Sequence, residues 1–227
     1  MTTLHIATRN AHKVTEIRAI LGDGFDYLTL NNIPGAPQVV EDANTFAGNA
    51  AKKSTELAHW LSGTRNSELG TRNSFVLADD SGLEVDALNG APGVHSARFA
   101  ALDSGMTGNS SDAENMAKLL RLLKDVPAVN RTARFRCVIA LTPVMLDRIE
   151  SSSPVCYANE SELQTVTFDG VCEGRIGFEP RGQNGFGYDP LFVPEGFSET
   201  FAELGDDVKN QLSHRARALA KLKAYFQ

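Results

Sequence analysis

Short apolar strands and amphipathic helices follow one another along this chain. Residues 4–8 are apolar and few enough for a strand, and apolar residues then recur at helical spacing until Gly22 supplies a stop. A second helix is expected over residues 45–61, which are rich in alanine and lysine. A strand, a loop and a helix in this order indicate a fold that combines both kinds of element.

The same mixture continues to the end of the sequence. Two short strands, residues 75–78 and 83–85, are expected on either side of a Ser-Gly turn. A capping-box pattern of Ser111 and Glu114 predicts a helix that begins near Asp112. Alternating apolar residues predict a long antiparallel strand pair in residues 131–141 and 164–174, and residues 208–226 are expected to form one helix with Leu212, Ala216, Leu219 and Ala220 on its inner face.

These elements predict an α/β fold with a mixed sheet, because the chain contains both strand-to-helix crossovers and hairpins. At 227 residues with 42% hydrophobic composition, the chain can bury a sizeable core as one large domain or two small lobes. The letters T-R-N-S occur twice within residues 63–74. We interpret this polar stretch as a surface loop. Two short copies are too few for a repeat protein, so a local insertion explains them better.

Composition excludes several classes of protein. No segment approaches the roughly 20 apolar residues of a membrane helix, and the N-terminus lacks the pattern of a signal peptide, so we expect a soluble cytoplasmic protein. Cys137, Cys156 and Cys172 are widely spaced and odd in number, which argues against disulfides and a zinc site and favours buried or idle thiols. The net charge of −6 argues against binding to nucleic acid, but it does not exclude a small anionic ligand.

Asp79 and Asp80 stand together where the predicted strand 75–78 ends. Neighbouring side chains of an extended strand point to opposite faces, so only one carboxylate is expected to reach a ligand. The alternative is that both aspartates cap the Ser-Gly turn. A Mg²⁺ site would need one or two such carboxylates together with phosphate oxygens and water.

Three further stretches carry polar or flexible residues suited to binding a nucleotide. Residues 7–13, "ATRNAHK", place a lysine at a helix N-terminus, which favours a phosphate. Residues 181–192, "RGQNGFGYDPLF", hold aromatic residues on a glycine-rich loop, which suits stacking on a flat ring, although a tight turn with core aromatics gives the same pattern. Residues 209–216, "KNQLSHRA", offer hydrogen-bond donors, although a solvated helix face is the alternative.

Five stretches in this order resemble the inosine triphosphate pyrophosphatase family: "TRNAHK", "TFAGNAAKK", "LADDSGLEVDALNGAPGVHSAR", "GFGYDPLF" and "KNQLSHR". The similarity covers most of the chain except residues 63–74 and the polar connection after Pro143. It implies a single domain over residues 1–227, with an elongated mixed sheet and two lobes around a substrate cleft, and a homodimer. It also implies Mg²⁺-dependent hydrolysis of dITP, ITP and XTP to the monophosphate and pyrophosphate, which removes them from the nucleotide pool.

Matching motifs implies a role for each site residue. Asp80 would be the general base that activates water, and it would hold the metal together with Glu41. Phe186 would stack on the base, and Arg215 or His214 would donate to its 6-keto group, which adenine lacks. Lys53 matches a basic position of the family. The remaining residues implied to contact the substrate are Thr8, Arg9, Asn10, Ala11, His12, Lys13, Ser81, Gly187, Tyr188, Asp189 and Lys209.

Two residues depart from the family pattern. Arg9 stands where glycine is usual, and it could add a phosphate contact or restrict the loop. Gly48 stands where glutamate is usual, and glycine weakens a helix start by roughly 0.5–1 kcal/mol relative to alanine. Two other functions stay open: a pyrophosphatase for other modified nucleotides, and a catalytically silent nucleotide-binding module.

Overall fold

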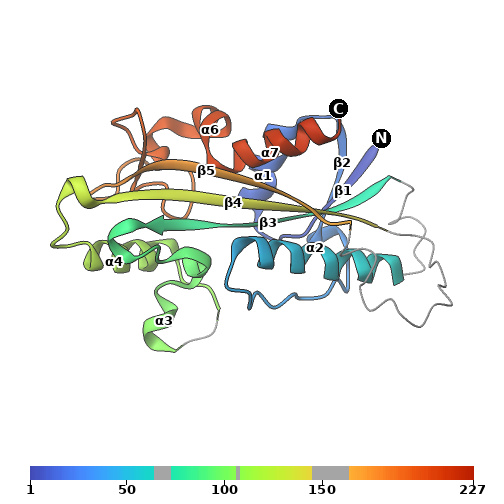
Figure 1. The fold of residues 1–227 in the computed structure, drawn as a ribbon, viewed down its shortest axis with the longest axis horizontal. Coiled ribbons are helices and arrows are strands. Elements are labelled where there is room, and N and C mark those ends of the chain that lie inside the picture. The colour runs from blue at the N-terminus through green and yellow to red at the C-terminus, as the bar shows by residue number, and fades with distance from the viewer. Residues whose placement is uncertain (64–72, 106–107, 145–163) are drawn as a thin grey trace. The chain divides into compact units, whose positions relative to one another are not determined.

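A computed structural model of the chain describes residues 1–63, 73–105, 108–144 and 164–227. Its six strands form one sheet in the order β2-β1-β3-β4-β5-β6 (Figure 1). β1 pairs in parallel with β2 and β3, whereas β5 pairs antiparallel with β6. The prediction of an α/β fold with a mixed sheet is therefore confirmed. The strands are β1 (Thr2–Ile6), β2 (Phe25–Thr29), β3 (Ser74–Val85), β4 (Thr132–Pro143), β5 (Val166–Ile176) and β6 (Phe192–Pro194).

The chain divides into two compact units. Unit 1 consists of Met1–Asp80, Val138–Phe168 and Leu219–Gln227, and unit 2 consists of Ser81–Cys137 and Asp169–Ala218. The predicted cleft between two lobes stays a prediction. The α-helices are α1 (Ala11–Leu21), α2 (Phe46–Gly63), α3 (Ala101–Ser104), α4 (Asp112–Leu122), α6 (Phe201–Leu212) and α7 (His214–Tyr225).

Unit 1 is built on the parallel strands β2, β1 and β3. Its helices α1 and α2 follow the predicted positions closely, and α2 buries Leu57, Ala58 and Leu61 in a cluster with Val76 of β3. The strand β2 was missed because the sequence of residues 25–29 has no clear alternation. Pairing with the buried β1 supplies the stabilisation that this short segment lacks by itself.

β3 is one uninterrupted strand of 12 residues, so the predicted Ser-Gly turn inside it is wrong. Serine and glycine favour turns locally, but here flanking apolar residues such as Leu77 and Leu83 are fully buried and keep the backbone extended. Asp79 and Asp80 therefore lie within a strand and not at its end. The alternative that both aspartates cap a turn is excluded by the same observation.

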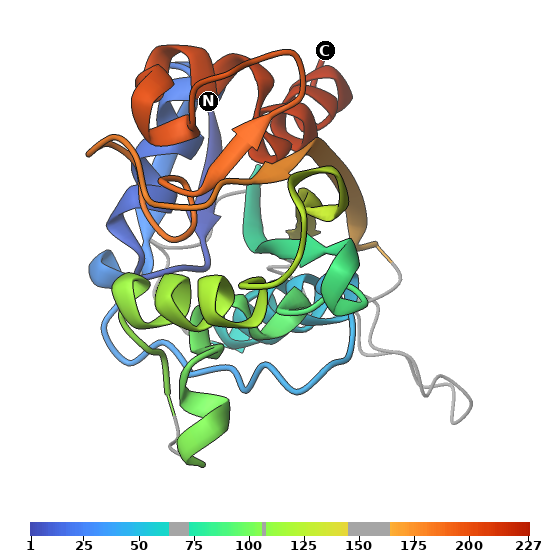
Figure 2. The same ribbon diagram turned by 90° about the vertical axis from the view of Figure 1, so that its left-hand side faces the viewer.

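Unit 2 has its own apolar core, in which Phe135, Phe192 and Phe201 pack together. The predicted capping box is present, since Ser111 accepts from the Glu114 N–H and Glu114 accepts from the Ser111 N–H. Figure 2 shows α4 beside the short helix α3, which the sequence did not predict. The Lys118 ammonium of α4 donates to the Phe99 carbonyl oxygen at 2.7 Å. This contact ties the residues just before α3 to α4.

The predicted helix over residues 208–226 is in fact two helices. Ser213 is extended between α6 and α7, with φ −66° and ψ 162°, and its hydroxyl accepts from the Ala216 N–H. This serine caps the new helix, which explains the break. Ala220 is exposed, contrary to the predicted inner face, whereas Leu219 and Leu222 are fully buried.

Other predictions have mixed outcomes. β4 and β5 are neighbours in the sheet as expected. Cys137 and Cys172 are buried, as the sequence suggested for these two. Cys156, most of the T-R-N-S stretch and most of the polar connection after Pro143 lie outside the described residues. Over the described ranges, no helix has both the length and the apolar character needed to cross a membrane.

Candidate active site

The loop between β1 and α1 forms the first part of the site, in unit 1. Asn10 caps α1: its side chain accepts from the Lys13 N–H at 3.2 Å, and its own N–H donates to Thr8 Oγ1 at 3.2 Å. This turn leaves Arg9, Ala11 and His12 exposed. Backbone N–H groups at a helix N-terminus attract anions, so the loop has the character predicted for a phosphate-side element.

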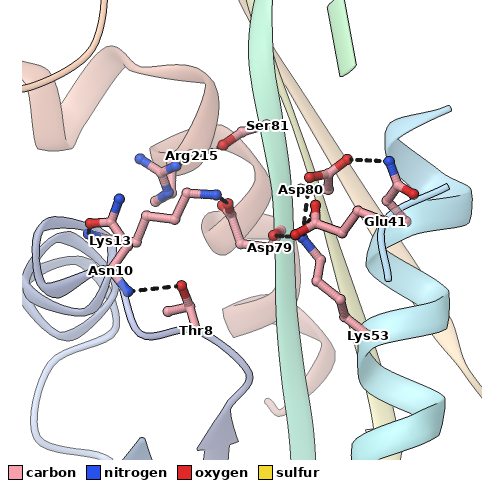
Figure 3. A network of polar contacts seen from close by, with 10 residues as sticks. Thr8, Asn10, Lys13, Glu41, Lys53, Asp79, Asp80, Ser81 and Arg215 are labelled. Carbon is pink, nitrogen blue, oxygen red and sulfur yellow. Dashed lines mark hydrogen bonds and ion pairs between the residues drawn. The ribbon is translucent and has the colours of Figure 1, made fainter. Parts of the chain in front are cut away.

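Asp79 and Asp80 lie on opposite faces of β3, as the sequence predicted. The Asp79 carboxylate pairs with the Lys13 ammonium, while Asp80 contacts residues of α2 (Figure 3). Both aspartates are buried. Asp79 is thus tied to the predicted phosphate-side loop, and it does not hold the turn that the sequence suggested.

Lys53 of α2 joins the carboxylates on the other face. Its ammonium lies 3.0 Å from Glu41 Oε2 and 3.1 Å from Asp80 Oδ1, and it donates to the Asp79 carbonyl oxygen at 2.8 Å (Figure 3). Glu41 and Asp80 are 39 residues apart in sequence, but one ammonium group binds both. The structure thereby brings together the two carboxylates and the lysine that the sequence assigned to the metal and the basic position.

Burial and charge shift the pKa values in this cluster in different directions. Burial raises the pKa of Asp80 to about 6 and outweighs the opposing effect of Lys53, and the nearby Glu41 carboxylate adds to the rise. Burial also acts to raise the pKa of Glu41, but Lys53 more than compensates and holds that pKa below its usual range. Two neighbouring carboxyl groups with pKa values pushed apart are typical of acid–base sites. At neutral pH Asp80 is mostly ionised and is a stronger base than an ordinary aspartate.

Asn49 is a member of this cluster that the sequence analysis missed. Its Nδ2 donates to Asp80 Oδ2 at 3.2 Å, and its Oδ1 accepts from the Ala43 N–H at 3.0 Å. Asn49 is almost fully buried and lies one helical turn before Lys53 on α2. A polar pair at i and i+4 on a face that is otherwise apolar was the available signal.

The carboxylates suit a hard cation that also binds phosphate. Within the described ranges, no group of three or more His, Cys, Asp or Glu side chains is placed to hold a metal by itself. Mg²⁺ takes one or two carboxylates and completes its shell with water and phosphate oxygens. Glu41 and Asp80 already converge on one positive group, so this oxygen donor set fits Mg²⁺ bound together with a triphosphate.

Unit 2 carries a second group of predicted residues. The break at Ser213 places Arg215 in the first turn of α7, where its Nη2 donates to Ser81 Oγ at 2.9 Å. Gly170 of β5 permits this packing, because a Cβ there would lie 2.0 Å from the His214 carbonyl oxygen. Ser81 and Arg215 are 134 residues apart in sequence, and the structure brings these two predicted substrate contacts together.

The loop that holds Phe186 folds around a buried ion pair. Asp189 Oδ2 lies 2.6 Å from Lys209 Nζ and also accepts from the Phe186 N–H at 2.8 Å. The Lys209 ammonium lies 4.5 Å from the centre of the Phe186 ring, within the range of a cation–π contact. Both charged side chains are almost fully buried, so they shape the loop that presents a half-buried aromatic ring.

The other predicted residues of unit 2 are engaged with the protein itself. The Tyr188 hydroxyl donates to the Ser96 carbonyl at 3.0 Å, and the Gly187 N–H donates to Asp112 at 2.7 Å. The His214 ring stacks on Phe135 with its centroid 4.8 Å away. Tyr188 and His214 are buried, and their contacts within unit 2 fix the loop and the start of α7.

The chain is similar to known proteins over nearly its whole length. The model of the Ham1 family matches residues 4–225. The dITP/XTP pyrophosphatase of Geobacter sulfurreducens is 45% identical over 224 residues, which cover 98% of this chain and 96% of the relative. That of Exiguobacterium sibiricum is 44% identical over 220 residues, 96% of this chain and 94% of the relative. A solved HAM1 protein from Coxiella burnetii is 34% identical with a TM-score of 0.75, covering 100% of this chain and 98% of that one.

Proposed function

The chain belongs to the Ham1 family, and we propose that it hydrolyses the non-canonical purine nucleoside triphosphates dITP, ITP and XTP to the monophosphate and pyrophosphate. The observation that carries this proposal is the cluster of Asp80, Glu41 and Lys53, in which a buried carboxylate is kept basic beside a second carboxylate and a cation. The curated relatives named above, which match the chain over nearly its whole length, support the same activity.

Asp80 is the general base of this proposal. A water molecule transfers a proton to its carboxylate and adds to a phosphorus of the α–β anhydride, and the bond to the bridging oxygen breaks to release pyrophosphate. Asn49 holds Asp80 Oδ2, which fixes the orientation of the carboxylate. Proton transfer by a positioned base contributes roughly 10²–10⁴-fold to a rate.

The triphosphate is assigned to groups of unit 1. The N–H groups at the start of α1 and the Lys13 ammonium offer positive charge. Lys53 adds a second ammonium beside Asp80. Glu41 and Asp80 are the carboxylates that would hold Mg²⁺. A bound Mg²⁺ would neutralise part of the phosphate charge and orient the phosphate chain.

The base of the nucleotide is assigned to groups of unit 2. The half-buried Phe186 ring offers a stacking surface, and Arg215 lies 5.8 Å from its centre. The Arg215 guanidinium carries only N–H donors, one of which contacts Ser81, and it is the group to which we assign the hydrogen bond with a 6-keto oxygen. A site that depends on such hydrogen bonds can reject a base lacking the acceptor by about 10⁴–10⁵-fold.

A substrate panel tests the proposed function. The purified protein is incubated with ITP, XTP, dITP, ATP or GTP, with Mg²⁺ or with EDTA, while pyrophosphate release is measured. We expect release from ITP, XTP and dITP far above that from ATP and GTP, and none in EDTA. Equal rates for all five would contradict the substrate claim, and undiminished rates in EDTA would contradict Mg²⁺ dependence. A preference for another modified nucleotide, or tight ITP binding without hydrolysis, would favour one of the two alternative functions.

A homodimer stays a prediction from the sequence resemblance, and a cytoplasmic location stays a prediction from the residues of the sequence itself.

A further inference from the structure

The segment of residues 41–45 lies along the first turns of α2. Glu41 and Asp42 pair with Lys53 and Lys52 at 3.0 and 2.7 Å, and the Ala43 N–H donates to Asn49 Oδ1. Thr45 caps the helix, since its Oγ1 accepts from the Gly48 N–H at 3.0 Å. The 41–45 segment is thus fixed to one helix, and it carries Glu41 to the ammonium that also binds Asp80.

Gly48 faces this segment from the first turn of α2. Its backbone is helical, with no positive φ, so any residue could adopt its conformation. The constraint is space: a Cβ at position 48 would lie 2.8 Å from the Ala43 Cβ and 3.1 Å from Thr45 Oγ1. Carbon atoms in contact lie about 3.5–4.0 Å apart, so a side chain at position 48 cannot fit beside Ala43 as it stands.

A side chain at position 48 would have to displace the backbone of the 41–45 segment, because the nearest atom is not the end of a flexible side chain. The Ala43 Cβ is attached directly to the backbone, so it moves only when the segment moves. Rotating the Thr45 side chain away would give up the cap on α2. Rotating Thr45 alone does not relieve the contact with Ala43, and displacing Ala43 moves Glu41, because Glu41 lies two residues before Ala43 in the same segment.

We propose that Gly48 is a positioning residue: the absence of a side chain there lets the 41–45 segment lie against α2 and brings Glu41 to Lys53 and Asp80. The roles of Glu41 and Asp80 rest on the proposed function, but the placement of the segment does not. Gly48 itself touches no reacting atom, and it acts through the position of Glu41.

Hydrogen exchange of the Ala43 amide tests the placement without any substrate. The variants are Gly48→Ala, Ala43→Gly, and the double variant, in which removal of the Ala43 methyl makes room for the new one. Gly63→Ala is the matched control, because Gly63 ends the same helix and a Cβ there meets nothing within 4 Å. We expect faster exchange at residue 43 in Gly48→Ala and protection close to wild type in the double variant and in the control. Unchanged protection in Gly48→Ala would overturn the proposal.

Kinetics test the consequence for Glu41. A misplacement of about 1 Å can cost up to 10²-fold, so we expect Gly48→Ala to lose roughly 10- to 100-fold in kcat/KM and to need more Mg²⁺ for half-maximal rate. The double variant should recover most of both, whereas a general loss of stability would not raise the Mg²⁺ requirement. A double variant no better than Gly48→Ala would overturn the proposal. If the wild-type protein hydrolyses no nucleotide, the proposed function fails, while the exchange experiment still decides the role of Gly48.

Discussion

At the scale of single residues, two adjacent aspartates have different surroundings because a strand directs neighbours to opposite faces. Asp79 pairs with Lys13, and Asp80 joins Lys53, Asn49 and Glu41. The pKa of Asp80 rises to about 6, mainly because the group is buried. The same burial that makes Asp80 a better base also makes its charged form unfavourable in the folded protein.

We expect Asp80→Asn to lose about 10²–10⁴-fold in kcat while the fold is retained, because the amide cannot accept the proton from water. Pyrophosphate release from ITP measures the loss, and circular dichroism checks the fold. Asp86→Asn is the control, because Asp86 is a partly exposed residue paired with Arg134 on the surface. Full activity of Asp80→Asn would remove Asp80 from the mechanism.

The raised pKa of Asp80 also predicts how stability depends on pH in the absence of metal. Between pH 4 and 6 the folded state holds a proton on Asp80 that the unfolded state has released, so wild-type stability falls as pH rises through this window. Asp80→Asn avoids this loss. In EDTA its free energy of unfolding should exceed that of wild type by about 1–3 kcal/mol at pH 8 and equal it near pH 4. Urea unfolding at both pH values measures the difference, and a difference independent of pH would contradict the expectation.

Cys172 should be unreactive in the folded protein. Burial raises the pKa of its thiol to about 11, so only on the order of one thiol in a thousand is ionised at pH 8. We expect iodoacetamide to leave the peptide containing Cys172 unmodified in the native protein and to modify it quickly in urea, as followed by mass spectrometry. Rapid native labelling of Cys172 would show that the thiol is not protected by burial.

At the scale of elements, helices with a clear apolar period were predictable and the continuity of strands was not. The positions of α1, α2 and α4 follow from spacing and caps, because those signals are local. The Ser-Gly pair suggested a turn, but burial of β3 within the protein kept it extended. The sequence does not predict the helix break at Ser213, because a serine within an apolar repeat also fits a continuous helix.

The same distinction between local signals and contacts that depend on packing applies to the candidate site. The motifs singled out Asp80, Glu41 and the Lys13 loop, and the structure shows that Asp80 and Glu41 meet at Lys53. The pairing of Asn49 with Lys53 on one face of α2 is a local signal, but the contacts of Asn49 with Asp80 and of Lys13 with Asp79 could not be predicted, because they depend on how α1 and α2 pack beside β3. Gly48 stands where the family usually has glutamate. The structure explains the glycine by the nearby Ala43 methyl, a contact that the sequence does not reveal.

The loop of Phe186 depends on the buried pair of Asp189 and Lys209. Replacing Lys209 by methionine leaves a buried carboxylate without its partner, which typically costs about 3–5 kcal/mol. The double variant Asp189→Asn, Lys209→Met removes both charges and keeps an acceptor for the Phe186 N–H, so it should regain most of this stability. Urea unfolding of the two variants measures the recovery. A double variant as unstable as Lys209→Met would show that the charge pair is not the cause.

At the scale of the whole molecule, the predicted homodimer can be tested directly. The chain has a mass of 24.5 kDa, so light scattering after gel filtration should give twice this mass. The measurement is repeated over a range of protein concentrations, because a dimer that dissociates would approach the mass of one chain on dilution. A mass of one chain at every concentration would contradict the prediction.

The two units exchange chain segments at four points, between residues 80 and 81, 137 and 138, 168 and 169, and 218 and 219. Each of these points lies inside β3, β4, β5 or α7, so no loop separates one unit from the other. The residues assigned to phosphate chemistry lie within residues 1–80 and those assigned to the base within residues 81–218, but the core of each unit is built from alternating segments of the chain. A recombination event at one point would move one set of residues without the later segments that complete the core of its unit, so a new base preference has to arise by substitutions within the existing chain.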